Sequence, residues 1–242
     1  MRKLIAPAMI VIAASLISAC GQSRGESGGP TVSRNYQVGG FQQIEVAGPY
    51  DVEVRTGSGP SVSARGSEKL LERTLVEVKA DRLYIHPKEH RGFNFGWSSR
   101  GKASFVVTVP QLRGATIAGS GGIKVDHVTG DAFEGTIAGS GGIELGQTDV
   151  QSLKLAIGGS GGVKAGTGKA KNAEYEIAGS GGIDAGSLAA EQAKVSIAGS
   201  GSIRAQATGT ADVDIMGSGD VSISGGAKCT INKAGSGNVR CS

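Results

Sequence analysis

Aromatic residues and cysteines are scarce in this chain of 242 residues. Phenylalanine, tryptophan and tyrosine together make up 4% of the sequence, and there are only three cysteines. So few large side chains argue against a wide globular core, because aromatic residues supply much of the buried area of such cores. The 42 glycines instead favour a thin, repetitive fold.

Long apolar runs and a strong charge of one sign are also missing. Beyond the N-terminus, no run of about 20 apolar residues could cross a membrane as a helix. The formal net charge is +4, and 23 basic residues face 21 acidic ones once Arg2 and Lys3, in a segment we expect to be removed, are left out. This even balance argues against nucleic acid as a partner.

Catalytic and cofactor motifs are absent or incomplete. The segment His86–His90 matches the H-x-x-E-H zinc-peptidase pattern. That pattern requires a helix, however, and Pro87 lies inside it. The glycine-rich tripeptides lack the Lys-Ser ending of a phosphate-binding loop and the aspartates of calcium-binding repeats. We therefore expect no catalytic residue, no metal and no cofactor, and a protein that is not an enzyme.

A tripeptide, Gly-Ser-Gly, recurs seven times in the second half of the chain. The copies begin at Gly119, Gly139, Gly159, Gly179, Gly199, Gly217 and Gly235. Their spacing is 20 residues four times and then 18 residues twice. A nearly fixed period of this size is typical of stacked units that bury their apolar faces against one another.

The segments on both sides of each tripeptide alternate apolar and polar residues, which predicts strands. Isoleucine recurs before the tripeptide at Ile117, Ile137, Ile157, Ile177, Ile197 and Ile215. A second apolar column follows it at Ile123, Ile143, Val163, Ile183, Ile203, Val221 and Val239. These columns predict an all-β fold, a parallel β-helix or solenoid of about seven turns. Gly-Ser-Gly-Gly would form its corner, where a positive φ and close packing exclude a Cβ.

Outward positions carry charges whose sign alternates from turn to turn. One series is Lys124, Glu144, Lys164, Asp184 and Arg204, and the other is Glu134, Lys154, Glu174, Lys194 and Asp212. Neighbouring turns lie about 4.8 Å apart, so opposite charges would pair, each pair contributing roughly 0.2–1 kcal/mol. A slip by one turn would bring like charges together, which fixes the register. The pattern predicts a solvated structural ladder; a catalytic or ligand-binding face is the alternative.

The N-terminus has the pattern of an export signal. Two basic residues precede an apolar core at 4–16, and Ile17–Cys20 resembles a bacterial lipobox. This resemblance implies that Cys20 becomes lipidated, and Gly21 after it implies an outer-membrane destination. The alternative is an ordinary signal peptide cleaved near Ala19. We therefore expect a lipoprotein of the cell envelope whose membrane attachment is a lipid anchor on Cys20.

The chain divides into four segments. Residues 1–20 are the lipoprotein signal peptide, 21–35 a flexible tether, 36–112 a β-rich N-terminal part, and 113–242 the repeat solenoid. Ser67–Glu72 is the one helical turn expected in the third segment. Its strand candidates are Gln43–Val46, Val52–Val54, Leu75–Val78, Leu83–Ile85 and Phe105–Val109.

A family resemblance rests on this third segment. The order Phe41-x-x-Ile44-x-Val46-x-Gly48, then Leu83-x-Ile85, then Val107-x-Val109-Pro110-x-Leu112 leads into the repeats. This order resembles the head GIN domain family, an adhesin-head family otherwise described as a domain of unknown function. The resemblance covers roughly residues 36–242. It implies an all-β fold with β-helical character, and it carries no established activity or site residues.

Two groups of residues are candidates for a role beyond the solenoid. Phe93, Phe95 and Trp97 gather in a polar, glycine-bearing segment, where they could bind a sugar ring or a protein, or else cover an end of the solenoid. Cys229 and Cys241 fall on inward positions of the last turn. In an exported protein they would form a disulfide, or else remain two small buried thiols.

These observations predict a non-enzymatic module of the cell envelope with a binding, adhesin-like or structural role. Its expected partner, besides the membrane, is an envelope protein or a glycan. Two alternatives stay open. One is a carbohydrate-active β-helix enzyme, which would need acids that converge in a groove. The other is a scaffold for another envelope protein.

Overall fold

The computed structural model describes residues 30–88 and 102–242. The elements before the first corner are β1 Thr31–Tyr36, β2 Gln43–Ala47, β3 Asp51–Thr56, β4 Ser61–Ser67, α1 Glu68–Glu72, β5 Thr74–Lys79, β6 Arg82–Pro87 and β7 Ala103–Val109. The repeats form β8 Gly114–Gly119, β9 Gly122–Gly139, β10 Gly142–Gly159, β11 Gly162–Ala165, β12 Gly168–Gly179, β13 Gly182–Gly199, β14 Ser202–Gly217, β15 Asp220–Ser224, β16 Lys228–Ala234 and β17 Asn238–Cys241.

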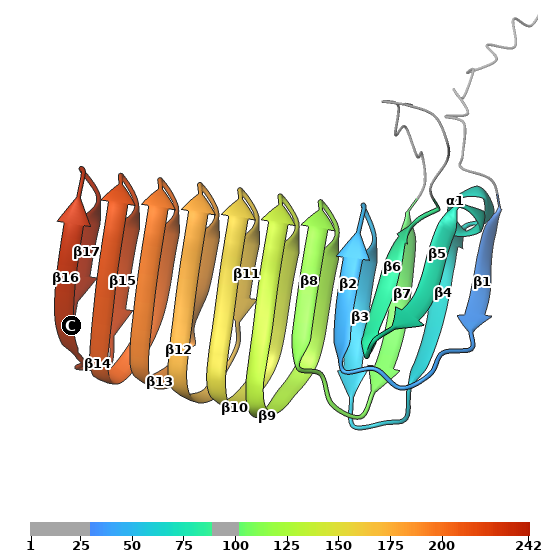
Figure 1. The fold of residues 1–242 in the computed structure, drawn as a ribbon, viewed down its shortest axis with the longest axis horizontal. Helices are drawn as coiled ribbons and strands as arrows, with labels where there is room; N and C mark the ends of the chain where they lie inside the picture. Colours follow the sequence, from blue (N-terminus) through green and yellow to red (C-terminus); the bar gives the residue numbers. More distant parts are fainter. Residues whose placement is uncertain (1–29, 89–101) are drawn as a thin grey trace, which may run out of the picture.

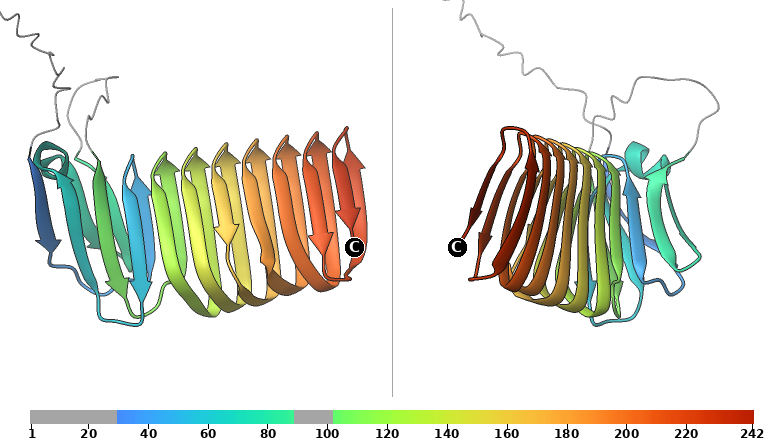
Figure 2. Two further views of the ribbon diagram at one scale, coloured as in Figure 1. Left: turned by 180° about the vertical axis from the view of Figure 1, so that it is seen from behind. Right: turned by 60° about the vertical axis from the view of Figure 1, so that its left-hand side comes forward.

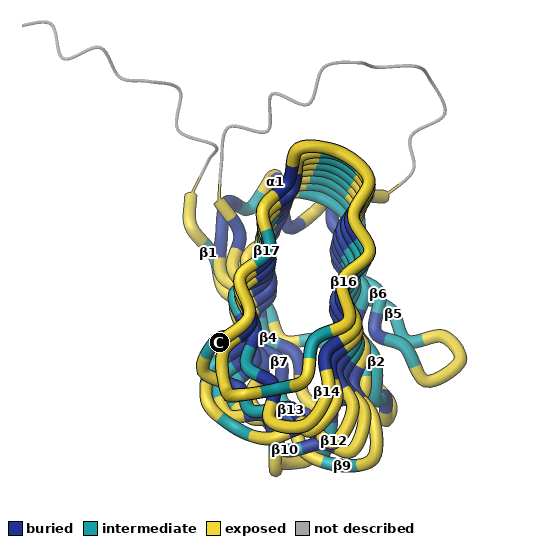
Figure 3. Tube along the Cα trace, turned by 90° about the vertical axis from the view of Figure 1, so that its left-hand side faces the viewer, coloured by how far each residue is buried: buried dark blue, intermediate teal, exposed yellow. Residues whose placement is uncertain are grey.

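The chain winds into a β-solenoid with two walls (Figures 1 and 3). In each turn the chain runs along one wall to a Gly-Ser-Gly corner and returns along the other. We call the wall before the corner sheet I. It contains β5, β6, β2, β8, the second halves of β9, β10, β13 and β14, and β12 and β16. Sheet II contains β1, β4, β7, β3, the first halves of the same four strands, and β11, β15 and β17.

The repeats pair in parallel and in the register that the sequence pattern predicts. Ile137 lies opposite Ile117 on one side and Ile157 on the other. The fold class is therefore confirmed as an all-β solenoid. The Gly-Ser-Gly repeats form about six turns rather than the seven expected, because seven corners enclose six intervals.

The two apolar columns form the core between the walls. The isoleucines of sheet I, from Ile117 to Ile215, are at most 2% exposed. In sheet II the column from Ile123 to Val221 is at most 3% exposed, and Val239 in the last turn is half-buried. Each turn covers the side chains of the turn before it, so the core is continuous along the axis.

The corners from Gly139 to Gly217 stack through the same two backbone hydrogen bonds. Ser140 donates its N–H to the Gly119 carbonyl at 2.9 Å, and Gly142 donates to Gly121 at 3.0 Å. Gly139 has φ +133°, a region that L side chains rarely adopt. A Cβ on Gly139 or on Gly141 would also collide with a carbonyl oxygen of the corner below. The first and third residues of the corner must therefore be glycine.

One further turn precedes the tripeptide repeats. β2 pairs in parallel with β8, and β3 pairs in parallel with β9. Gly48 has φ +124° and donates its N–H to Ala118, while Gly122 donates to Tyr50. Ala47–Tyr50 thus forms a corner without the Gly-Ser-Gly sequence. The solenoid begins inside the predicted segment 36–112, so the predicted boundary after residue 112 is not a structural break.

Antiparallel strands and a short helix cover the N-terminal end of the solenoid (Figures 1 and 2). β4 pairs antiparallel with β7 and β1, and β5 pairs antiparallel with β6. α1 connects the two walls and buries Leu70 and Leu71. Because β1 starts at Thr31, the last five residues of the predicted tether, 31–35, belong to sheet II.

Candidate functional site

The charges predicted to form a ladder on sheet II do lie on neighbouring turns. Glu144 is in register with Lys124 on one side and Lys164 on the other, and Asp184 is in register with Arg204. Two ion pairs form along this column, Lys124 with Glu144 at 4.0 Å and Arg204 with Asp184 at 2.8 Å. The column alternates in sign, and its charges are balanced largely within the chain.

The ladder on sheet I is more tightly bonded. Lys154 lies 3.2 Å from Glu174 and 3.1 Å from Glu176, and Lys194 lies 3.4 Å from Glu174. Partial burial works against ionisation of Glu174, but the hydrogen bonds from both lysines outweigh it and lower the pKa of this carboxyl group. The bonds to Glu176 and Glu174 raise the pKa of Lys154. These charges stabilise one another.

The outer face of sheet II carries two shallow hollows. One, of ≈ 450 Å³, lies towards the N-terminal end, and its charged lining residues are Asp51, Glu53, Lys124 and Glu144. The other, of ≈ 570 Å³, lies towards the C-terminal end, and its charged lining residues are Asp184, Arg204, Asp220 and Arg240. Both hollows lie on sheet II but on different strands. The first lies over β3, β7, β9 and β10, and the second over β11, β13, β14, β15 and β17.

Glycine at the fourth corner position lines both hollows. A Cβ on Gly142 would have its nearest neighbour, the Gly162 carbonyl oxygen, at 3.7 Å, which is ordinary contact. Ser202 and Asp220 occupy this position in later turns, where the parallel pairing continues. The fold therefore accepts side chains here. Glycine at this position keeps the outer surface low beside the charged column.

Serine hydroxyls form a line along the corner edge. They belong to Ser120, Ser140, Ser160, Ser180, Ser200, Ser218 and Ser236, and all seven serines are exposed. Within residues 30–88 and 102–242, none of these hydroxyls has a hydrogen-bond partner. The corner edge thus offers a regular series of donors and acceptors to solvent or to a ligand.

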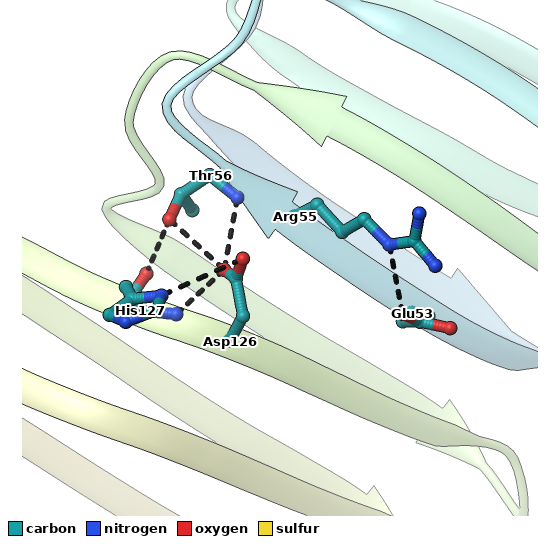
Figure 4. A network of polar contacts seen from close by, with 5 residues as sticks. All are labelled: Glu53, Arg55, Thr56, Asp126 and His127. Carbon is teal, nitrogen blue, oxygen red and sulfur yellow. Dashed lines mark hydrogen bonds and ion pairs between the residues drawn. The ribbon is translucent and has the colours of Figure 1, made fainter.

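A polar network joins the end of β3 to the first repeat (Figure 4). The backbone N–H groups of Thr56 and His127 donate to Asp126 Oδ1 at 2.9 and 2.6 Å, and the Thr56 hydroxyl lies 3.0 Å from the same oxygen. Burial disfavours the carboxylate, but these bonds and the nearby His127 outweigh it and lower the pKa of Asp126. Asp126 therefore acts as a fixed acceptor at this junction.

The structure also describes part of the rejected zinc-peptidase motif. His86 lies at the end of strand β6, with Nδ1 2.9 Å from the Pro87 carbonyl oxygen and Nε2 3.5 Å from Glu77. The zinc-peptidase motif needs both histidines on one face of a helix, whereas His86 lies on a strand. Across the described part of the chain, no three His, Cys, Asp or Glu residues gather as metal ligands would.

Several predicted site residues lie outside the described residues. These are the lipidation site Cys20 and the aromatic candidates Phe93, Phe95 and Trp97. The strands that flank the aromatic segment are described. β6 runs parallel to β2 and β7 runs parallel to β3, so β6 ends and β7 begins at the corner edge of the solenoid.

Cys229 and Cys241 are joined by a disulfide in the structure. Cys229 is in register with Ala211 of sheet I, and Cys241 is in register with Ile223 of sheet II. The bond therefore connects the two walls within the last turn.

These features define a β-solenoid with a capped N-terminal end, a hollowed polar face and a line of corner hydroxyls. The chain belongs to the family described as "Putative auto-transporter adhesin, head GIN domain", which matches residues 40–227. The resemblance found in the sequence is thereby confirmed. The family and its solved relatives are adhesin-like, which points to a protein of the cell surface or envelope.

Solved structures share the fold over nearly their whole length. A "putative adhesin" from Bacteroides fragilis is 24% identical, with a TM-score of 0.78 over 88% of this chain and 97% of its own. A "Putative lipid binding protein" from Parabacteroides distasonis is 25% identical, with a TM-score of 0.70 over 89% and 98%. No protein of curated function matches the sequence.

Proposed function

We propose that this chain is a non-enzymatic, adhesin-like module of the cell envelope that binds its partner over the outer face of sheet II. The observation that carries the proposal is the hollowed face itself. It presents the same low glycine position and the same alternating charges through successive turns. Such a surface suits an extended partner, a glycan chain or a segment of an envelope protein, better than a compact substrate.

The arrangement of the acids favours binding over hydrolysis. The N-terminal hollow does contain three carboxylates, Asp51, Glu53 and Glu144. Glu53, however, accepts a hydrogen bond from Arg55 at 2.9 Å, and Glu144 pairs with Lys124. A glycosidase needs one carboxyl group whose pKa is raised so that it can donate a proton. Every carboxyl pKa that shifts in the described chain, those of Glu77, Asp126 and Glu174, shifts downwards.

A lipid ligand is less well supported by the exposed surface. Among the described residues, the large hydrophobic side chains that are exposed are Met216 and Ile231. Isolated apolar residues of this kind do not form a lipid-binding patch. The one helix of the described chain, α1, is too short to cross a membrane. We therefore assign membrane attachment to a lipid on Cys20 and partner binding to sheet II.

The test raises the surface in and beside the N-terminal hollow without disturbing the fold. The double substitution Gly142→Leu/Gly162→Leu adds two outward side chains where a Cβ has no neighbour closer than 3.7 Å. We expect binding of the Cys20→Ser chain to isolated envelopes of the producing bacterium to fall at least about tenfold, which corresponds to about 1.4 kcal/mol. The matched control is Ala178→Leu/Ala198→Leu, on adjacent turns of sheet I, where both alanines are exposed.

Equal binding by both double variants would show that sheet II is not the binding face. The enzymatic alternative has its own measurement, the release of reducing ends from a panel of linear polysaccharides. We expect none. Release by the unmodified chain that is lost in Glu53→Gln or Glu144→Gln would establish a carbohydrate-active enzyme instead.

A further inference from the structure

The alternation of charge along sheet II is interrupted in one turn. The strand register places one outward residue of each turn in a single column, and its members in order are Glu53, Lys124, Glu144, Lys164, Asp184, Arg204, Ser222 and Arg240. The sign of the charge alternates at every step from Glu53 to Arg204. Ser222 then stands where an acid is expected. Arg204 and Arg240, two turns or roughly 9.6 Å apart, therefore have no acid between them in this column.

Both guanidinium groups have donors left for a ligand. Arg204 donates from Nη1 to Asp184 Oδ2 at 2.8 Å, but a guanidinium carries five N–H donors. Within residues 30–88 and 102–242, the Arg240 side chain has no hydrogen-bond or ion-pair partner. The disulfide from Cys241 to Cys229 ties the strand that carries Arg240 to sheet I. The two arginines thus hold positive charge on either side of Ser222.

The small side chain of Ser222 leaves room for an anion between the arginines. Ser222, Arg204 and Arg240 all line the C-terminal hollow of ≈ 570 Å³, and all three are exposed. Their strands β14, β15 and β17 lie side by side (Figure 1). A carboxylate placed over Ser222 would restore the alternation of the column. Arginine pairs with carboxylates through two parallel hydrogen bonds, which favours this anion.

The corner side of the same hollow is lined by polar side chains. The fourth corner position is glycine from Gly122 to Gly182, and it then becomes Ser202, Asp220 and Asn238 in successive turns. These side chains lie two residues before the column on each strand and so share its face. Asp220 Oδ1 accepts the backbone N–H of Asn238 at 3.2 Å. The Asp220 carboxylate would repel an anion beside it, which confines the anion to the side of the arginines.

This combination fits an acidic sugar better than an acidic protein segment. Serine, aspartate and asparagine side chains exchange hydrogen bonds with hydroxyl groups, which a sugar ring carries beside its carboxylate. An aspartate or glutamate of a protein would meet the arginines equally well but would bring no hydroxyls to the corner side. Extended protein segments also bind sheets mainly through free backbone groups at an edge, whereas this hollow lies on the face of sheet II.

We propose that the C-terminal hollow binds a uronic-acid residue of a glycan, with its carboxylate between Arg204 and Arg240. The hydroxyls of the sugar contact Ser202, Asp220 and Asn238. This inference rests on the proposed function, because it names the chemistry of the partner on the same face. Ser222 determines specificity in this arrangement. An acid at this position would complete the column and exclude the carboxylate of the ligand.

The test measures binding of a labelled linear oligogalacturonate to the Cys20→Ser chain, where the predicted lipid is absent. We expect methyl esterification of the probe, which removes its charge, to lower the affinity at least about tenfold. Ser222→Glu should lower it by a similar factor without lowering the free energy of unfolding, because the new carboxylate lies between two cations. Arg240→Gln should weaken binding as well. The matched control is Ser224→Glu, which adds the same charge further along β15, outside the lining of the hollow, and should bind like the parent.

The outcomes separate this inference from the proposed function. A parent chain that does not bind oligogalacturonate would overturn the inference, and the proposed function would still stand if Gly142→Leu/Gly162→Leu weakened binding to envelopes. Oligogalacturonate binding that Ser222→Glu abolishes would support the inference even if envelope binding ignored the leucine variant. Equal losses in Ser222→Glu and Ser224→Glu would show a general effect of charge and overturn the site. Equal affinity for an oligoglutamate of the same charge would overturn the assignment to a sugar.

Discussion

At the scale of single residues, Tyr175 is a core side chain whose burial lowers stability. It lies on β12 in register with Leu155 and Val195, it is fully buried, and its hydroxyl has no hydrogen-bond partner in the described structure. A buried hydroxyl without a partner costs roughly 1–3 kcal/mol. We expect Tyr175→Phe, which removes only the hydroxyl, to raise the free energy of unfolding by about 1 kcal/mol in denaturant titrations.

The matched control for this change is Tyr50→Phe. Tyr50 is also buried, but its hydroxyl accepts a hydrogen bond from Thr74 at 3.0 Å. Removing a satisfied hydroxyl should lower stability by about 1 kcal/mol, so the two substitutions should have opposite signs. If Tyr175→Phe also destabilised the protein, the hydroxyl of Tyr175 would have to be making a useful interaction.

The same residue governs the response to alkaline pH. Burial raises the pKa of Tyr175 above its ordinary value of 10.0. The unfolded chain therefore loses this proton at a lower pH than the folded chain does. The titration of this group therefore leaves stability unchanged below about pH 10 and lowers it as the pH rises above that value. Tyr175→Phe should make this alkaline decline shallower.

At the scale of strands, the charge ladders fix how turns stack. Glu174 lies between Lys154 and Lys194 and contacts both, so Glu174→Lys would place three cations in a row. We expect a loss of about 1 kcal/mol in thermal or denaturant unfolding. Because the pKa of Glu174 is lowered in the folded chain, its contribution is present above the unfolded pKa and is lost as the pH falls through the folded one.

A double-mutant cycle checks that this effect comes from adjacent turns. Combining Glu174→Lys with Lys194→Glu should give a coupling energy of at least about 0.5 kcal/mol, because the two side chains are in direct contact. Combining it instead with Lys124→Glu, on sheet II, should give additive effects. Additivity in both cycles would contradict the ladder.

Local periodicity explains why the strands of the repeats were predictable. The isoleucine columns, the charge ladders and the corners all follow from side chains that alternate between two faces and recur at one spacing. β1 and the corner at Ala47–Tyr50 were not predicted. Neither matches the repeat, and both depend on pairing with distant strands, β4 for the first and β8 and β9 for the second.

The candidate site was predicted only in part. The charged column of sheet II could be read from the sequence, but the hollows beside it could not. In Gly-Ser-Gly-Gly, the third and fourth residues look alike in sequence. Only the structure separates Gly141, whose Cβ would collide with Gly121, from Gly142, whose Cβ would have room. The binding role proposed for this face therefore depends on a difference between two glycines that the sequence alone does not reveal.

At the scale of the whole molecule, the proposed membrane attachment depends on one residue. Cys20 is the predicted lipidation site, and in the sequence it precedes β1, the first described strand. We expect Cys20→Ala to abolish labelling with a radioactive or clickable fatty acid and to move the protein from the membrane fraction to the soluble fraction. Unchanged membrane retention without labelling would rule out the lipoprotein assignment.

The repeated corner bonds also bear on how this molecule could change over evolutionary time. Five successive corners, from Gly139 to Gly217, each donate to the corner before them through the same pair of backbone bonds, whether the repeat has 20 residues or 18. A unit duplicated within the gene would therefore find matching partners above and below, with both ends of the solenoid unaltered. Each unit gained or lost would change the length by about 4.8 Å. The length of the solenoid can thus vary in small, equal steps without a new fold.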